Sequence, residues 1–182
     1  MFFLSLFFLL TSCSSQLHYD SSDAQIEADR PCATLKDFVV CDFPAIDPQG
    51  DDAKLSDLRG KPVVIDLSAM WCPPCIEAGN SISATAEQFP QVTFLTVLIE
   101  NTTGQPPSAL DLNDWKLARD IEASPVWGSS REIISSDPTD LENHFYLDGW
   151  PTFYFVNSDG VLVEYMRGFS ETALIEKALA LD

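Results

Sequence analysis

Basic residues are scarce in this sequence. Its 182 residues include 10 lysines and arginines against 28 aspartates and glutamates, which gives a net charge of −18. A surface that binds nucleic acid needs clustered lysine and arginine to neutralise phosphates, so we expect no nucleic-acid partner. The acidic excess is interpreted as a solvated surface, which could also steer a basic protein partner.

A long apolar run is also missing. The apolar segment at residues 2–10 is far shorter than the roughly 20 residues that a membrane-spanning helix needs, so residues 1–12 are interpreted as an export signal. The sequence LTSC at residues 10–13 resembles the bacterial lipoprotein box, which implies that Cys13 is acylated and anchors the chain to a membrane. The missing lysine or arginine near the start leaves an ordinary secretory signal as the alternative. Residues 13–35, rich in serine and aspartate, are predicted to form a flexible tether.

Residues 36–182 have the makings of one globular domain, since 46% of the whole sequence is hydrophobic and 21% is charged. A β-branched apolar run at residues 62–67 predicts a strand buried on both faces. The helical spacing of apolar residues from Pro73 to the stop at Pro90 predicts a helix. A second buried strand at residues 92–99 completes a βαβ unit, in which the two strands are parallel.

The other elements are predicted from turn signals and periodicity. They are a strand and hairpin at 38–46 closed by a turn at 47–50, a helical turn at 54–58, helices at 110–121 and 139–146 around an extended segment at 124–127, a β-hairpin at 152–165, and a final helix that begins at Ser170. Leu117 and Leu179 are among the residues expected to face the core. The predicted fold class is α/β, with an N-terminal hairpin extension and an insertion before the last hairpin and helix, which we expect to carry substrate specificity.

The sequence Trp71-Cys72-Pro73-Pro74-Cys75 lies where the first buried strand leads into the helix. Backbone N–H groups and the helix dipole at such a turn stabilise a thiolate, which is the reactive form of a thiol. We expect Cys72 to be the exposed nucleophile and Cys75 to be the resolving thiol, since residues three apart on a helix are neighbours. A structural bridge and a metal site are the other uses of such a pair.

Asp66 interrupts the apolar strand that leads into this motif. A carboxyl group buried there has a raised pKa, which suits it to exchange a proton with the resolving thiol near neutral pH. The alternative is that Asp66 lies at the outer end of the strand, in contact with water.

The remaining cysteines have other expected uses. Cys32 and Cys41 are expected to form a structural disulfide in an oxidising compartment, and the alternative is a second redox pair that exchanges with Cys75. Acylation of Cys13 would account for the odd cysteine among five. Zinc needs four ligands, and the spacing of Cys32 and Cys41 with the two histidines matches no common pattern, so neither a metal site nor a cofactor is expected.

With these elements in order, residues from about 41 to 182 resemble the thioredoxin superfamily, and in particular its TlpA/ResA-like branch of bacterial extracytoplasmic reductases. The sequence LSDLRGKP at residues 55–62, followed by the strand and WCPPC, carries the resemblance. It implies a thioredoxin-like fold with a central mixed sheet and helices on both faces. Asp66 matches the buried acid of thioredoxins, and Gly168 matches a position near the site. The usual helix proline is missing here, so any kink in the helix would come from Gly79.

The resemblance also assigns the residues that meet a substrate. The sequence GWPT at residues 149–152 is similar to the cis-proline loop of the family. Pro151 would then face the disulfide, and Trp150 would offer backbone hydrogen bonds to a bound partner. Trp71 and Pro73 would shape the rim of the substrate-binding surface.

The predicted function is an exported, periplasm-facing thiol-disulfide oxidoreductase that reduces protein disulfides, including those met in cytochrome c maturation. Its partners would be protein thiols and disulfides and a membrane thiol-disulfide electron donor, with a lipid anchor in the membrane. A thiol peroxidase is one alternative, although the Pro-x-x-x-Thr-x-x-Cys surround is absent before Cys72. A lipid-tethered module that binds Cu(I) is another. The direction of electron flow does not follow from the two prolines of the motif.

Overall fold

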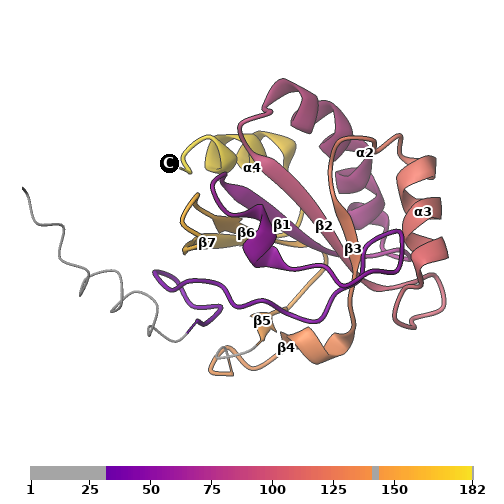
Figure 1. Ribbon diagram of the computed structural model, residues 1–182, viewed down its shortest axis with the longest axis horizontal. Helices are drawn as coiled ribbons and strands as arrows, with labels where there is room; N and C mark the ends of the chain where they lie inside the picture. Colours follow the sequence, from indigo (N-terminus) through magenta and orange to yellow (C-terminus); the bar gives the residue numbers. More distant parts are fainter. Residues whose placement is uncertain (1–31, 141–143, 182) are drawn as a thin grey trace, which may run out of the picture. The chain divides into compact units, whose positions relative to one another are not determined.

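A five-stranded sheet organises residues 32–140 and 144–181, which are the residues that the computed structural model describes (Figure 1). The strand order is β3-β2-β1-β6-β7, with parallel pairing from β1 to β3 and antiparallel pairing from β1 through β6 to β7. The strands are β1 (Val63–Ala69), β2 (Thr93–Glu100), β3 (Val126–Gly128), β6 (Thr152–Val156) and β7 (Leu162–Arg167). The mixed sheet and the βαβ unit confirm the predicted fold class.

The predicted export signal, Cys13 and most of the predicted tether lie outside the described residues. Ala33 is buried, and its N–H donates to the carbonyl oxygen of Val39 at 2.9 Å, so the chain already packs on the domain at this point. Within the two described ranges, no helix combines the length and the apolar character that a membrane crossing requires.

The α-helices share one face of the sheet. They are α2 (Pro73–Gln88), α3 (Ala109–Ala118) and α4 (Glu171–Ala178). Helices α2 and α4 pack with alternate residues of β1, β2 and β6 in one apolar cluster. Helix α3 contributes Leu112 and Trp115 to a neighbouring cluster that also contains both cysteines of WCPPC. The redox motif therefore lies where α2, α3 and the sheet meet.

The opposite face of the sheet is covered by shorter elements. Two 3-10 helices, η1 (Leu55–Leu58) and η2 (Arg131–Ile133), each bury one apolar side chain in the cluster on this face. A small parallel sheet of β4 (Ile134–Ser135) and β5 (Phe145–Tyr146) lies in the same part of the chain. Helical elements thus lie on both faces, but the three α-helices of the described residues all lie on one.

The strand predicted at residues 38–46 is not formed. Val39 makes an isolated bridge to the residue before β7, and Ile46 makes one to the last residue of β3. These two strands are opposite edges of the sheet, so the segment crosses the sheet and cannot pair along a single strand. The predicted turn at 47–50 closes one bridge, between Ile46 and Asp52, instead of a longer hairpin.

The helix predicted at residues 139–146 is also wrong where the structure can be described, since 141–143 lie outside the described residues. Phe145 is in β5 and is 1% exposed. Its ring meets those of Phe43 and Tyr154 edge to face, with centroids 5.3 and 4.9 Å away. This packing between distant parts of the chain overrides the local helical pattern.

Two apolar residues expected in the core are exposed. Leu117 of α3 is 84% exposed, and Leu179 after α4 is 47% exposed. Helix α3 ends at Ala118, earlier than predicted, and Asp120 then adopts a positive φ of 54°. A left-handed residue of this kind ends a helix. Leu117 lies inside α3 but two positions after Trp115, so it points away from the face that Leu112 and Trp115 bury.

Gly79 permits close packing between two helices. Helix α2 runs as one helix from Pro73 to Gln88 through this glycine. A Cβ atom at Gly79 would lie 2.8 Å from Cδ of Arg119 and 3.0 Å from Cζ2 of Trp115. The absence of a side chain thus lets α3 approach α2.

Candidate active site

Cys72 and Cys75 are joined by a disulfide at the point where β1 leads into α2, with their Cα atoms 5.2 Å apart. Cys72 is the N-cap of α2, and its Sγ accepts a hydrogen bond from the backbone N–H of Cys75 at 3.3 Å. Prolines occupy the first two helical positions, where a missing N–H has no intrahelical partner to lose. The same N–H and the helix dipole can stabilise a Cys72 thiolate after reduction.

Cys72 lies deeper than the sequence predicts. Cys72, expected to be exposed, is 2% exposed, and Cys75 is fully buried. The disulfide turns both sulfurs toward the cluster in which Leu112 and Trp115 of α3 pack. Cys72 is still the more accessible of the two, so a partner has to reach it at the rim of the site.

Asp66 lies in the interior of the protein. It is 1% exposed, which rules out the alternative of a solvated carboxylate. Its strand neighbour Val64, which points to the same face, packs with Ala78 and Ile82 of α2. Asp66 therefore faces the helix that carries Cys75.

Burial raises the pKa of Asp66 from 3.8 to about 7. The hydroxyl of Ser68 opposes this rise, since it donates a hydrogen bond of 2.6 Å to Asp66 Oδ1. The hydroxyl of Thr96, next to Asp66 in the pairing of β1 with β2, also lowers the pKa. The desolvation of the carboxylate outweighs both, and Asp66 is left able to take up or release a proton near neutral pH.

The loop at residues 149–152 has the geometry of a cis-proline loop. The Trp150–Pro151 peptide bond is cis. The N–H of Gly168 donates to the carbonyl oxygen of Pro151 at 2.8 Å, and Thr152 Oγ1 donates to the carbonyl oxygen of Gly149 at 2.9 Å. Thr152 pairs with a residue near the carboxyl end of β1, so the loop lies at the same edge of the sheet as the disulfide.

A buried glutamate connects the two rims of the site, and sequence reasoning missed it. Glu100, the last residue of β2, is 5% exposed. Its Oε2 accepts a hydrogen bond of 2.7 Å from Trp71 Nε1, and its Oε1 accepts one from Arg131 Nε. The rings of Trp71 and Trp150 meet edge to face at 6.2 Å. The sequence did offer one signal for Glu100, which is an acid at the carboxyl end of an apolar parallel strand, where functional residues often lie.

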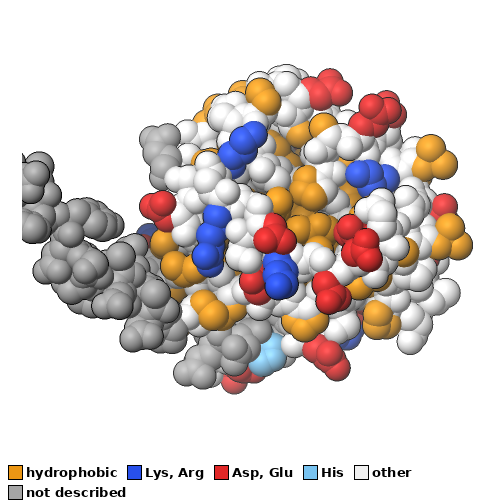
Figure 2. Space-filling view, in the orientation of Figure 1, with side chains coloured by type: hydrophobic (Ala, Val, Ile, Leu, Met, Phe, Trp, Pro, Cys, Tyr) orange, Lys and Arg blue, Asp and Glu red, His pale blue; other side chains and the backbone are white. Residues whose placement is uncertain are grey.

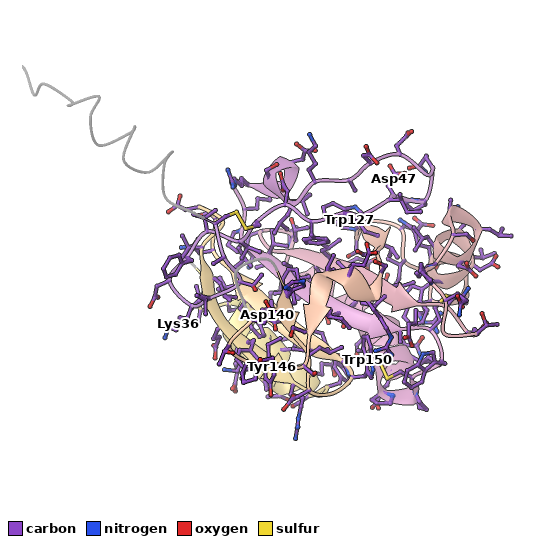
Figure 3. All side chains as sticks on the ribbon, turned by 90° about the horizontal axis from the view of Figure 1, so that it is seen from below. Lys36, Asp47, Trp127, Asp140, Tyr146 and Trp150 are labelled. Carbon is purple, nitrogen blue, oxygen red and sulfur yellow. A yellow bond between two sulfur atoms is a disulfide. The ribbon has the colours of Figure 1, made fainter. Side chains whose placement is uncertain are left out.

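The disulfide between Cys32 and Cys41 lies far from the redox motif. Figure 3 shows the two disulfides apart, one beside Trp150 and the other near the first described residues. The Cys32–Cys41 loop bridges the sheet through Val39, at the end where β1 begins. Seven residues of β1 separate that end from the motif, or about 20 Å. Direct exchange of this disulfide with Cys75 is therefore not possible within the folded domain.

Charged side chains of both signs are interspersed on the face seen in Figure 2, with apolar side chains between them. The acidic excess is not gathered into one patch on this face. This distribution agrees with the interpretation of the charge as a solvated surface.

Similarity to known proteins covers most of the chain. The model of the AhpC/TSA family matches residues 36–165. A thioredoxin of Geodia cydonium is 26% identical over 126 residues, which are 69% of this chain and 85% of that protein. The crystal structure of the exposed lipoprotein thioredoxin of Streptococcus pneumoniae is 26% identical, with a TM-score of 0.55, and the match covers 77% of this chain and 98% of that one. A secreted thiol-disulfide isomerase of Corynebacterium glutamicum shares the fold at 17% identity, with a TM-score of 0.62 over 96% of this chain and 97% of that one.

Proposed function

The chain belongs to the AhpC/TSA family, and from this premise we propose that it is an exported thiol-disulfide oxidoreductase that reduces disulfides in other proteins. One observation carries the proposal. The Cys72–Cys75 disulfide lies at the N-terminus of α2, and the helix faces Asp66, a buried acid whose pKa is about 7. This combination supplies a stabilised thiolate and a proton acceptor in one site.

The first step is the attack of reduced Cys72 on a substrate disulfide. The Cys72 thiolate forms a bond with one substrate sulfur, and the other substrate sulfur leaves as a thiolate that takes up a proton. Trp71, Pro73 and the Trp150–Pro151 loop form the rim at which the substrate binds. The Cys75 N–H, which already reaches Cys72 Sγ at 3.3 Å, stabilises the attacking thiolate.

The second step releases the substrate. Asp66 accepts the proton of the Cys75 thiol, and the resulting thiolate attacks Cys72 Sγ. The mixed disulfide breaks, the second substrate sulfur leaves and is protonated, and Cys72 and Cys75 become joined. Two electrons have passed from the enzyme to the substrate, and a dithiol donor in the membrane would restore the reduced enzyme by the reverse exchange.

Export is supported by the apolar segment at residues 2–10 and by the LTSC sequence. The similar Streptococcus pneumoniae protein is itself described as an exposed lipoprotein. A lipid on Cys13 would hold the domain near a membrane donor. The reducing direction, and with it a part in cytochrome c maturation, is supported by the TlpA/ResA-like signature at residues 55–62 and WCPPC. A reduction potential near −120 mV for the Cys72–Cys75 couple would mark the protein as an oxidant instead.

The proposal is tested by trapping with Cys75→Ser, which removes the resolving thiol. We expect this variant to accumulate mixed disulfides between Cys72 and its protein substrates, to be identified by mass spectrometry. The matched control is Cys72→Ser, which keeps one thiol in the same motif and should trap far less. Equal trapping by both variants would contradict the assigned roles. Peroxide turnover that survives Cys75→Ser, or Cu(I) bound in proportion to the reduced pair without reductase activity, would favour the alternative functions.

A further inference from the structure

A cavity of about 530 Å³ lies beside the cis-proline loop. One wall comes from residues 131–136, which follow β3, and the other from residues 147–150, which end at the cis-proline. Trp150 belongs to the cavity and also packs with the cluster that contains both redox cysteines. A group bound in the cavity is therefore next to the place where a substrate sulfur must bind. Its volume is in the range that holds a small ligand or a few side chains.

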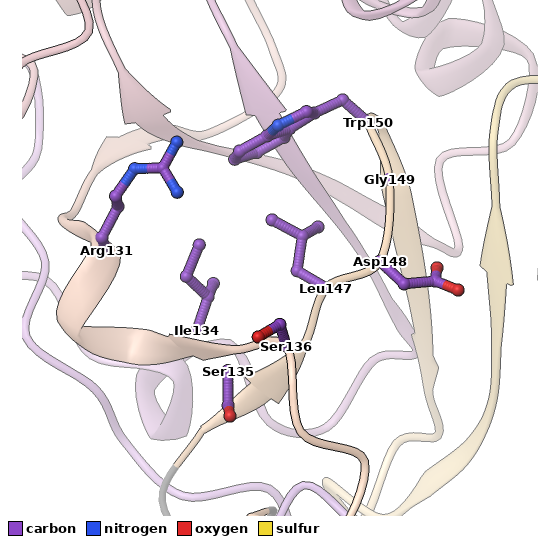
Figure 4. A pocket seen from close by; sticks show the side chains of 8 residues that line it. All are labelled: Arg131, Ile134, Ser135, Ser136, Leu147, Asp148, Gly149 and Trp150. Atoms are coloured by element: carbon purple, nitrogen blue, oxygen red, sulfur yellow. The ribbon is translucent and has the colours of Figure 1, made fainter.

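The lining of the cavity mixes three apolar side chains with serine hydroxyls and one cationic group. Figure 4 shows the guanidinium of Arg131 and the ring of Trp150 on one side of the cavity, with the side chains of Ile134 and Leu147 pointing toward them from the other. Asp148 points away from the cavity in this view, and its carboxylate accepts a hydrogen bond of 3.1 Å from Arg167. Of the described residues that line the cavity, Arg131 alone carries a positive charge.

Arg131 forms an ion pair with a buried carboxylate. Its Nε donates to Glu100, whose side chain is 6% exposed, whereas the Arg131 side chain is 64% exposed. Glu100 is itself fixed by Trp71 at 2.7 Å. The bond through Nε leaves the two Nη groups at the outer end, and no hydrogen bond occupies them within the described part of the chain. Two parallel N–H donors in this arrangement match a carboxylate.

We propose that this cavity is a substrate subsite, which selects peptide segments that carry an aliphatic side chain and a carboxylate close to the reacting cysteine. The inference rests on the proposed function, because it assigns the chemistry of the protein substrate at the same site. The aliphatic side chain packs on Ile134 and Leu147, and the carboxylate binds the Nη groups of Arg131. Glu100 is a positioning residue, since it acts on the substrate only through Arg131 and Trp71. The Nη groups of Arg131 are the donors that the cavity offers to this carboxylate, since the Nε of Arg131 is already paired with Glu100.

The test uses disulfide-bonded peptides that are identical except at one position, which carries Glu, Gln or Lys and is moved through the positions flanking the reacting cysteine. The rate at which each peptide oxidises the reduced enzyme is followed by tryptophan fluorescence. At one flanking position we expect the Glu peptide to react about fivefold faster than the Gln peptide, which equals about 1 kcal/mol at 1.4 kcal/mol per tenfold. The Lys peptide should be slower than both, and added salt should reduce the differences.

Arg131→Gln should abolish the preference for Glu, and the ratio of the two peptide rates within each variant corrects for any general loss of activity. The matched control is Arg59→Gln, which removes the same charge from an exposed residue before β1, at the opposite end of the sheet. This control should keep the preference. Equal rates for the Glu and Gln peptides at every position, or a preference that survives Arg131→Gln, would overturn the subsite while leaving the proposed function intact. Failure of the reduced wild type to react with any disulfide would instead refute the proposed function.

Discussion

The buried carboxyl group of Asp66 predicts an unusual dependence of stability on pH. Its pKa is about 7 in the folded protein and close to 3.8 in an unfolded chain. Between these values the folded state holds the proton and the unfolded state has released it, so a rise in pH favours unfolding. The contribution of Asp66 to the free energy of unfolding is therefore most favourable below about pH 4 and falls as the pH rises toward 7. This is the reverse of a salt-bridged aspartate, whose contribution grows with pH.

The magnitude follows from the same two values. Each pH unit between them corresponds to about 1.4 kcal/mol, so the interval from 3.8 to about 7 corresponds to about 4 kcal/mol. Asp66→Asn removes the titration and keeps an oxygen that can accept the Ser68 hydroxyl. Relative to wild type, the variant should gain about 4 kcal/mol of stability between pH 4 and pH 8. Burying the amide of Asp66→Asn costs the variant the same free energy at pH 4 and at pH 8, so it does not alter the expected change between these two pH values.

The assay is guanidinium unfolding of the oxidised wild type and Asp66→Asn at several pH values from 4 to 8, with both disulfides intact. The free energies of unfolding of the two proteins should diverge as the pH rises, and the divergence should level off above the folded pKa. If the free energies of unfolding of the two proteins instead change in parallel across the whole pH range, Asp66 is ionised in the folded protein. That result would refute the role of Asp66 as proton acceptor for Cys75.

Two further predictions concern stability. Gly79→Ala should destabilise the protein by about 1–3 kcal/mol in urea unfolding, because the new Cβ would lie 3.0 Å from Cζ2 of the buried Trp115 ring, which cannot move aside as the Arg119 side chain can. The exposed neighbour Asn80→Ala is the control, and equal effects of the two changes would refute the close-packing argument. Replacing Cys32 and Cys41 together by Ser should lower the free energy of unfolding by about 2–3 kcal/mol, since their disulfide closes a short loop. Disulfide reductase activity should be unchanged. A loss of activity in the folded variant would show that this disulfide takes part in the redox cycle.

The elements around the redox motif were predictable because their signals are local. The apolar runs of β1 and β2 and the helix between them follow from periodicity over a few residues. The two wrong elements, at residues 38–46 and 139–146, have apolar side chains that serve contacts across the sheet. Segment 38–46 crosses from one edge of the sheet to the other, and Phe145 packs against Phe43 of this segment. The spacing of apolar residues within a short segment does not predict such contacts.

The sequence by itself determined the chemistry of this protein: two cysteines at a strand-to-helix turn, with an acid in the strand before them. Two effects create this chemistry: the electrostatics of a helix N-terminus and the desolvation of a carboxyl group inside an apolar strand. Both act over short stretches of chain, so the local sequence is enough to predict them. Only the tertiary structure decided how a partner reaches that chemistry. It buried Cys72 to 2% exposure, brought the cis-proline loop to the same edge of the sheet, and joined Glu100 to Arg131 and Trp71. These contacts join residues about 30 positions or more apart and exist only once the sheet and its covering segments have packed.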